Sequence, residues 1–361
     1  MTNTSIRNRA KTYFDIIKDY TMGITSKDGS FVDPSTAIAE LSKKVSEMSE
    51  IIQRLSKDSF AEVSDADGFA SAMADPNAAV VTVSSGTFTA PTEPIQRSMI
   101  LKGSCSGVSA ATGDRCSDVT GEDETVLTGT LSFSEGADAI LDGLTVSVET
   151  FVSLAGNSDV TMRNCRIVDC APDREKSYLI KGTSFDNKVK LVLDGCYFGT
   201  NTANELGKMY NGLELQATLL DGSIISNCYF AKNCVTHNVI NIYGIDEGAT
   251  VYIKNNHFEY SANAIRLGVV GEPTCRIICE GNSYDATDPD PNWSGLMIIQ
   301  PYGKRTTSHA NMTVEINNTK HSDNGQLLYL FANPSDTQFT EENKPKVYVD
   351  GVLQKLDPVE V

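Results

Sequence analysis

The sequence predicts a mainly β protein, in which a parallel β-solenoid follows N-terminal α-helices and a short coiled coil. Three observations predict this fold. A four-residue phrase with a Gly or Asn corner returns at intervals of 21 to 40 residues along most of the chain. The position directly after the corner repeats thiol and amide side chains. A heptad pattern of apolar residues precedes the first repeat. Such a period is typical of stacked rungs.

Nine tetrads share the corner and define the repeat. They are LKGS (101), LDGL (141), MRNC (162), LDGC (193), ISNC (225), IKNN (253), CEGN (279), INNT (316) and VDGV (349). Their Gly or Asn occupies positions 103, 143, 164, 195, 227, 255, 281, 318 and 351. These residue types tolerate a left-handed backbone best, so we expect that conformation at each corner. A β-sandwich would also give many short strands, but it provides no reason for one corner to recur.

The position after the corner is predicted to form one interior column. It is occupied by Ser104, Leu144, Cys165, Cys196, Cys228, Asn256, Asn282, Thr319 and Val352. We expect a core ladder at Cys165, Cys196, Cys228, Asn256 and Asn282. Thiols fill small apolar spaces, and stacked amides hydrogen-bond from rung to rung. A metal site at the three cysteines is the weaker alternative, because thiols on rungs about 4.8 Å apart would point along one line.

Two helical segments precede the repeats. Residues 1–33 are predicted to be a helical anchor with apolar residues at Ile6, Tyr13, Phe14, Ile17 and Tyr20. Residues 34–58 are predicted to be a short coiled-coil helix whose oligomerisation seam is Ile38, Leu41, Val45, Met48, Ile52 and Leu55. The a and d residues alone favour two strands, so the order depends on the domain that follows. The alternative is an amphipathic helix that lies on its own domain.

Charge and cysteine content exclude several classes of protein. The formal net charge is -17, which disfavours a nucleic-acid partner. The first residues lack the apolar core of a signal peptide and no later run is long enough to span a membrane, so we expect folding in a cytoplasm. Nine cysteines without paired CxxC motifs indicate free thiols rather than disulfides or zinc. A reducing cytosol argues against a bridge between Cys105 and Cys116.

The repeats resemble a known fold family. The segment AAVVTVSSGTFTAPTEPIQRSMILKGS (78–104) and the rungs VTMRNCRI, LVLDGCYF, SIISNCYF and VYIKNNHF resemble right-handed parallel β-helices of the pectin-lyase-like kind. The resemblance covers about residues 60–361 and places the β-helix, with a C-terminal capping rung, at 59–361. The order of helix, heptad segment and β-helix is similar to that of trimeric bacteriophage fibres, tailspikes and head-attached decoration proteins.

The resemblance implies a structural virion protein. We expect a homotrimeric surface fibre, spike or capsid decoration protein, assembled in the host cytoplasm and displayed on the virion surface. Its N-terminal helices would bind capsid or tail proteins, and its outer face would contact a host surface glycan. We expect no cofactor. The alternatives are a tailspike depolymerase, either a polysaccharide lyase or a glycosidase, and a non-catalytic glycan-binding module.

The sequence assigns no catalytic residue. The Asp-Asp and His-Gly signatures of polygalacturonases and the Arg-Pro element of pectate lyases are absent. Glu214 lies mid-strand and is expected on a solvated outer face, and His257 is also expected to point outward. Candidate glycan or cation contacts are Asp285, Asp288, Asp290 and Trp293. The alternative for the three aspartates is an ordinary acidic turn.

Overall fold

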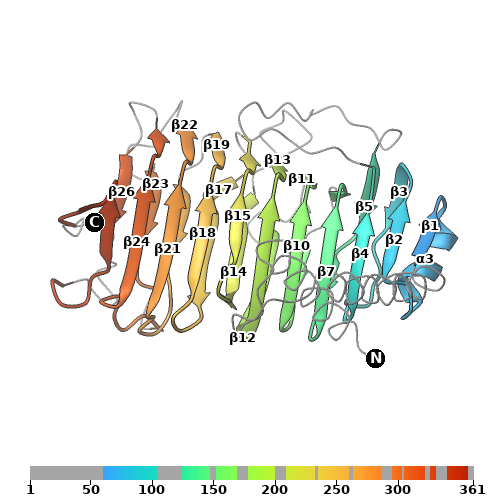
Figure 1. Ribbon diagram of the computed structural model, residues 1–361, viewed down its shortest axis with the longest axis horizontal. Coiled ribbons are helices and arrows are strands. Elements are labelled where there is room, and N and C mark those ends of the chain that lie inside the picture. Colours follow the sequence, from blue (N-terminus) through green and yellow to red (C-terminus); the bar gives the residue numbers. More distant parts are fainter. Residues whose placement is uncertain are drawn as a thin grey trace, which may run out of the picture.

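The computed structural model describes residues 60–104, 124–146, 152–168, 178–199, 209–231, 235–259, 263–285, 295–302, 305–321, 326–330 and 340–356. These residues form a long stack of parallel strands, the topology of a β-solenoid. Figure 1 shows the strands of successive turns side by side, from β1 at the blue end to β26 at the red end. The predicted anchor (1–33) and the predicted heptad helix (34–58) lie outside the described residues.

Each turn of the solenoid, which we call a rung, contributes strands to three faces. The first face carries the strands that precede the Gly or Asn corner. Its strands are β1 (Phe60–Val63), β2 (Val80–Val83), β4 (Ser98–Lys102), β7 (Ala137–Asp142), β10 (Ser158–Arg163), the second half of β12 (Tyr178–Asp194), β15 (Ile224–Ser226), β18 (Thr250–Lys254), β21 (Cys275–Glu280), β24 (Met312–Asn317) and β27 (Lys346–Val349).

The second face carries the short strands that follow the corner. Within the described residues it is a nine-stranded sheet in chain order. Its strands are β3 (Gly86–Thr89), β5 (Thr125–Thr128), β8 (Thr145–Val146), β11 (Arg166–Val168), β13 (Tyr197–Gly199), β16 (Tyr229–Phe230), β19 (His257–Glu259), β22 (Ser283–Asp285) and β25 (Lys320–His321).

The third face lies between the second face of one rung and the first face of the next. Its strands are β6 (Leu131–Phe133), β9 (Val152–Leu154), the first half of β12, β14 (Met209–Leu219), β17 (Val235–Ile245), β20 (Asn263–Leu267), β23 (Gly295–Ile299) and β26 (Gln326–Leu330). β12 continues from the third face to the first, and its register against β14 shifts between Thr183 and Lys188. The two faces therefore belong to one hydrogen-bonded sheet.

The register of the first face follows the spacing of the nine tetrads. The residue just before each corner pairs with the residue just before the next corner. The pairs are Lys102 with Asp142, Asp142 with Arg163, Arg163 with Asp194, Asp194 with Ser226, Ser226 with Lys254, Lys254 with Glu280, and Glu280 with Asn317. Residues about thirty apart in the sequence are therefore vertical neighbours, as the repeat predicts.

The corners adopt the predicted left-handed conformation with one exception. Positive φ angles occur at Gly143, Asn164, Gly195, Asn227, Asn255, Gly281, Asn318 and Gly351. Gly103 is the exception, since its φ is not positive. A Cβ atom at Gly103 would come within 2.4 Å of the carbonyl oxygen of Gly143, so that close approach explains this glycine instead.

The predicted core ladder forms a buried column in the structure. Cys165, Cys196 and Cys228 are each 0% exposed. The backbone N–H of Cys228 donates to Oδ1 of Asn256 (3.0 Å), and the backbone N–H of Asn256 donates to Oδ1 of Asn282 (3.0 Å). The amide nitrogens of Asn256 and Asn282 donate to backbone carbonyls of the preceding rung. Each amide thus satisfies buried backbone groups that would otherwise be costly.

Thr125, and not the predicted Ser104, occupies the column next to Leu144. Thr125 is fully buried, and it is the register neighbour of Gly86 on one side and of Leu144 on the other. Its hydroxyl donates to the backbone carbonyls of Val83 and Ser84. Ser104 is exposed, and its backbone N–H donates to the Thr125 hydroxyl at 3.0 Å. The prediction of Ser104 in the column is therefore wrong, because the second-face strand of this rung begins after residues 105–123.

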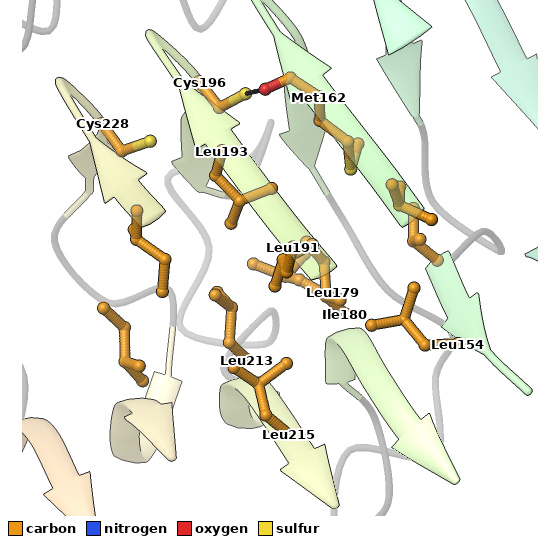
Figure 2. Packing of buried hydrophobic residues seen from close by; sticks show 14 of the residues in the cluster. Leu154, Met162, Leu179, Ile180, Leu191, Leu193, Cys196, Leu213, Leu215 and Cys228 are labelled. Atoms are coloured by element: carbon orange, nitrogen blue, oxygen red, sulfur yellow. Dashed lines mark hydrogen bonds between the residues drawn. The ribbon is translucent and has the colours of Figure 1, made fainter. Parts of the chain in front are cut away.

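The thiols of the column donate to the backbone. Cys196 Sγ donates to the carbonyl oxygen of Met162 on the preceding rung at 3.5 Å, as Figure 2 shows. Burial raises the pKa of the Cys196 thiol well above its ordinary value. A protonated thiol is a poor metal ligand. Within the described residues no group of three or more His, Cys, Asp or Glu side chains could hold a metal ion.

Aliphatic and aromatic side chains fill the rest of the interior in similar stacks. Figure 2 shows Leu191 and Leu193 packed with residues of neighbouring strands. The ring centroids of Phe198 and Phe230 are 4.7 Å apart, and those of Phe230 and Phe258 are 4.9 Å apart. Both pairs are nearly parallel. Repetition of one residue type from rung to rung therefore fixes the register of the core.

A helix closes the N-terminal end of the described solenoid, where the sequence predicts only strands. Asp65 caps α3 (Ala66–Ala74) by accepting a hydrogen bond from the backbone N–H of Gly68 at 2.8 Å. Phe69 of this helix packs on Phe88 of β3 with centroids 5.4 Å apart. Arg97 donates to the last carbonyls of α3, those of Ala72 and Met73. The helix therefore shields the first rungs.

A hairpin closes the other end. β28 (Val352–Leu353) turns back and pairs antiparallel with β27. Asp350 and Gly351 have φ angles of 47° and 78°, as a two-residue hairpin turn of the I′ type requires. Val352 is 64% exposed, so the ninth corner turns outward and Val352 does not continue the interior column. The described chain therefore ends in a hairpin and not in a further parallel rung.

Candidate functional site

The outward side of the third face carries a row of four different polar residues. Lys181, Glu214, Asn241 and Arg266 occupy one register position on β12, β14, β17 and β20. Their neighbours along each strand, such as Leu213, are in the core, so strand alternation directs the row outward. Parallel strands place such residues about 4.8 Å apart. The row is therefore close enough for direct side-chain contacts.

Glu214 is only 3% exposed, although it points outward. The Nδ2 atom of Asn241 donates to Glu214 Oε2 at 2.9 Å, and the Nε2 atom of Gln216 donates to Oε1 at 3.1 Å. The expectation of a solvated Glu214 is thus wrong. The alternation of side chains along a strand predicts that Glu214 points outward. It does not predict that the amides of Asn241 and Gln216 take the place of water around the carboxylate.

Tyr243 connects Asn241 and Arg266. Its hydroxyl oxygen accepts from Asn241 Nδ2 at 2.8 Å and from Arg266 Nη1 at 2.9 Å. Arg266 Nη1 is also 3.2 Å from Asn241 Oδ1, and its Nε donates to Gln300 Oε1 at 3.0 Å. Burial raises the pKa of Tyr243, while the charge of Arg266 opposes that shift. The phenol therefore remains protonated at neutral pH.

Three aromatic rings and two guanidinium groups lie beside this network. Phe185, Tyr243 and Tyr302 contact one another with centroid distances of 6.3, 6.1 and 4.6 Å. Arg266 Cζ lies 5.2 Å from the centroid of Tyr243, and Arg305 Cζ lies 5.3 Å from that of Phe185. These distances are typical of cation–π contacts. We call these five residues the arginine–aromatic cluster.

Sequence reasoning missed this cluster. Phe185 lies where the register of β12 shifts, and the Thr218 hydroxyl donates to its backbone carbonyl at 2.8 Å. Tyr302 and Arg305 follow β23 and are outside any strand. Their approach depends on turns between the third and first faces, and those turns share no repeated phrase. The polar periodicity of Glu214, Asn241 and Arg266 would be visible only after the rungs were aligned.

The second face carries a different outward column. Tyr197, Tyr229 and His257 are register neighbours, and their rings stack with centroid distances of 5.7 and 4.8 Å. The Tyr229 hydroxyl donates to Glu259 at 2.9 Å, and His257 Nδ1 lies 2.7 Å from the hydroxyl of Ser283. Burial lowers the pKa of His257. Tyr197 and Tyr229 are each 8% exposed, so their ring faces are occupied by one another.

A buried ion pair lies farther along this face. Arg166 Nε is 3.4 Å from Glu124 Oε2, and their side chains are 1% and 9% exposed. Thr145, the register neighbour of Arg166, also hydrogen-bonds to Glu124 through its hydroxyl. Such a group is costly to break and offers no open surface for a ligand. We therefore regard it as structural.

The four candidate ligand contacts divide between described and undescribed residues. Asp285 ends β22 and is the register neighbour of Glu259. Asp288, Asp290 and Trp293 lie outside the described residues. The structure thus places Asp285 beside one other carboxylate, Glu259, on the second face. The strands of the arginine–aromatic cluster belong to the other sheet.

Comparison with known proteins adds no family. No protein-family model, no curated protein and no solved structure matches this chain. Within the described residues, no helix is long and apolar enough to cross a membrane. The arginine–aromatic cluster is the candidate site because it combines two cations, the half-buried rings of Phe185 and Tyr302 and buried polar support on one outer face.

Proposed function

We propose that this chain is a structural component of a bacteriophage particle, a homotrimeric surface fibre, spike or capsid decoration protein. One observation carries the proposal. The described rungs stack in register from β1 to β27, and α3 and the β27–β28 hairpin occupy the two ends. Covered ends prevent strand addition by other chains. A rod with these properties suits a role that demands rigidity outside a cell.

The proposed assembly depends on the heptad segment. Ile38, Val45 and Ile52 at a positions, with Leu41, Met48 and Leu55 at d positions, would bundle three chains beside the solenoid. Residues 1–33 would then contact a capsid or tail protein. This part of the proposal rests on the sequence pattern and on the resemblance in element order to phage fibres.

The mass of the full-length chain in solution tests the assembly. The variant Val45→Asp/Ile52→Asp places two charges in the seam and should convert trimers to monomers, with an unchanged far-ultraviolet circular dichroism signal from the strands. The control Ser46→Asp/Gln53→Asp adds the same charges outside the seam and should remain trimeric. A monomeric wild type, or a seam variant that stays trimeric, would overturn the homotrimer. Immunogold labelling of purified phage particles tests the location, and unlabelled particles would overturn it.

A polysaccharide-degrading enzyme is the second candidate. It is favoured by a carboxylate, a phenol and a guanidinium on one outer face, since the Tyr243 hydroxyl interacts with both Glu214 and Arg266. Glycoside hydrolysis uses two carboxyl groups about 5 to 9.5 Å apart, and this group supplies one. The raised pKa of Tyr243 also makes it a poor base at neutral pH. New reducing ends or unsaturated uronate ends released from bacterial glycans would favour the enzyme over the scaffold.

A further inference from the structure

We propose that the arginine–aromatic cluster binds an acidic sugar residue of a glycan. This inference goes beyond the scaffold role and does not depend on where the chain is displayed. It rests on Phe185, Tyr243, Arg266, Tyr302 and Arg305, whose rings and guanidinium groups lie within 6.3 Å of one another in the pairs given above. The cluster offers two features that an acidic sugar requires, which are cationic donors and the accessible parts of the half-buried Phe185 and Tyr302 rings.

The cationic donors come from a fixed backbone. The N–H of Arg305 donates to the carbonyl of Tyr302 at 3.2 Å, and the carbonyl of Arg305 accepts from the N–H of Gly271 at 2.7 Å. The Arg305 residue is exposed, and its guanidinium lies 5.3 Å from the Phe185 centroid and 5.8 Å from that of Tyr302. The two rings restrict the position of the guanidinium, which remains on the exposed side of the cluster.

The two arginines lack carboxylate partners among the described residues. The ion pairs of this part of the chain do not include Arg266 or Arg305. Arg266 instead donates to Gln300, Asn241 and Tyr243, which are neutral acceptors. Glu214 is the acid of this network, where it accepts from Asn241 and Gln216 and also interacts with the Tyr243 hydroxyl. The two guanidinium groups therefore outnumber the one carboxylate of this network, on a chain whose net charge is -17.

This charge distribution selects the class of ligand. A guanidinium binds a carboxylate, sulfate or phosphate through paired N–H donors, and aromatic rings contact the C–H face of a sugar. A nucleic acid is disfavoured because the net charge of -17 would repel the many phosphates that two cations leave unneutralised. Interplanar angles of 50° to 89° also mean that the three rings are not parallel plates between which successive bases could stack. A single acidic sugar residue fits these features.

The polar network would position the cations. Asn241 and Gln300 fix two nitrogens of Arg266, and Tyr243 supplies a third contact, so the guanidinium needs little reordering when a ligand arrives. Preorganised donors lose less entropy on binding than flexible ones. The buried carboxylate of Glu214 holds Asn241 in place through a 2.9 Å hydrogen bond. We therefore assign Glu214 a positioning role in this site.

Calorimetric titration of the full-length chain tests the proposal. The probes are a hyaluronan tetrasaccharide (carboxylate), its methyl ester (neutral), a sulfated chondroitin tetrasaccharide and a glycerol-phosphate oligomer. We expect binding of at least one anionic probe, weakening with added salt, and no binding of the neutral ester. The relative affinities of the carboxylate, sulfate and phosphate probes then identify the source of the negative charge.

Three variants separate binding from structural support. Arg305→Gln should weaken binding of the anionic probe by about tenfold or more, and Arg305→Lys should recover part of that loss. Arg276→Gln removes an exposed cation from the first face, where Arg276 pairs with Glu315, and should bind within about twofold of wild type. All three should retain the wild-type melting temperature within about 2 °C.

Two results would overturn the site. One is the absence of binding by the wild type for every anionic probe, and the other is equal affinity of Arg305→Gln and the wild type. These outcomes are independent of the seam variants, because the mass of the assembly does not report on glycan binding. A trimer without anion binding would therefore leave the scaffold in place and remove only this inference.

Discussion

The interior column and the outward row of the third face are built on the same geometry but on opposite chemistry. In the column, Cys165, Cys196 and Cys228 stack like on like, and the amides that follow repeat one hydrogen-bond pattern. In the row, Glu214 and Arg266 occupy equivalent register positions two rungs apart yet carry opposite charges. The same rung spacing therefore supports both repetition and variety.

The difference teaches which contacts specify the fold and which are free to specialise. Interior positions face neighbours of their own kind, so a substitution on one rung disturbs the rungs on both sides. Outward positions meet a different partner on each rung, and their hydrogen bonds depend on that pair alone. We therefore expect the solenoid to depend on the column and the surface chemistry to depend on the row.

The largest expected effect comes from a charge in the column. Cys196→Asp would bury an unpaired carboxylate beside Cys165 and Cys228, at a cost of at least about 4 kcal/mol in the free energy of unfolding. Urea unfolding followed by circular dichroism measures this loss. Val192→Asp places the same charge on an outward position of β12 in the same rung and should cost less than about 1 kcal/mol. Similar stability of the two variants would show that inward and outward positions are not distinct.

The sequence predicts the column because its signal is repetition. The Gly or Asn corner places each following residue in the slot, so Cys196, Cys228 and Asn256 could be aligned without coordinates. The prediction fails where the repeat is interrupted. Residues 105–123 separate Ser104 from the strand that begins at Thr125, and the hairpin turns Val352 outward.

The candidate site could not be predicted in the same way. Glu214 and Arg266 lie in third-face strands, and the number of residues between each corner and the following third-face strand differs from rung to rung. Tyr302 and Arg305 lie outside the strands, and Phe185 lies at a register shift of β12. No repeated phrase marks these positions, so their proximity becomes visible only in three dimensions. Helix α3 was missed because it occurs once, at the end of the stack.

An intermediate effect is expected in the row. Tyr243→Phe removes the hydroxyl that accepts from Asn241 and Arg266, leaving one donor of each without that acceptor, and should cost about 2 kcal/mol. Urea unfolding measures the change. Tyr252→Phe alters a half-buried tyrosine on the first face and should change stability by less than about 0.5 kcal/mol. An equal effect of the two substitutions would mean that the row is not a hydrogen-bonded unit.

The smallest expected effect is that of His309, which is fully buried but lies outside the column. It tests whether burial alone, without stacking in the column, disfavours a charge. Its Nε2 atom is 2.8 Å from the carbonyl oxygen of Val269, and burial lowers its pKa from 6.5 to about 4. The folded state therefore binds a proton less readily than the unfolded state. The stabilising contribution of neutral His309 is complete above about pH 6.5 and falls as the pH decreases toward about 4.

Between about pH 7 and pH 5.5 the contribution of His309 should fall by about 1 kcal/mol. This interval stays above the sequence isoelectric point of about 4.7, where a neutral chain would tend to associate. Urea unfolding of the wild type and of His309→Gln at both pH values measures the difference, since the other three histidines remain in both proteins. If the two proteins lose equal stability over this interval, His309 titrates normally in the fold, and burial away from the column does not exclude a charge.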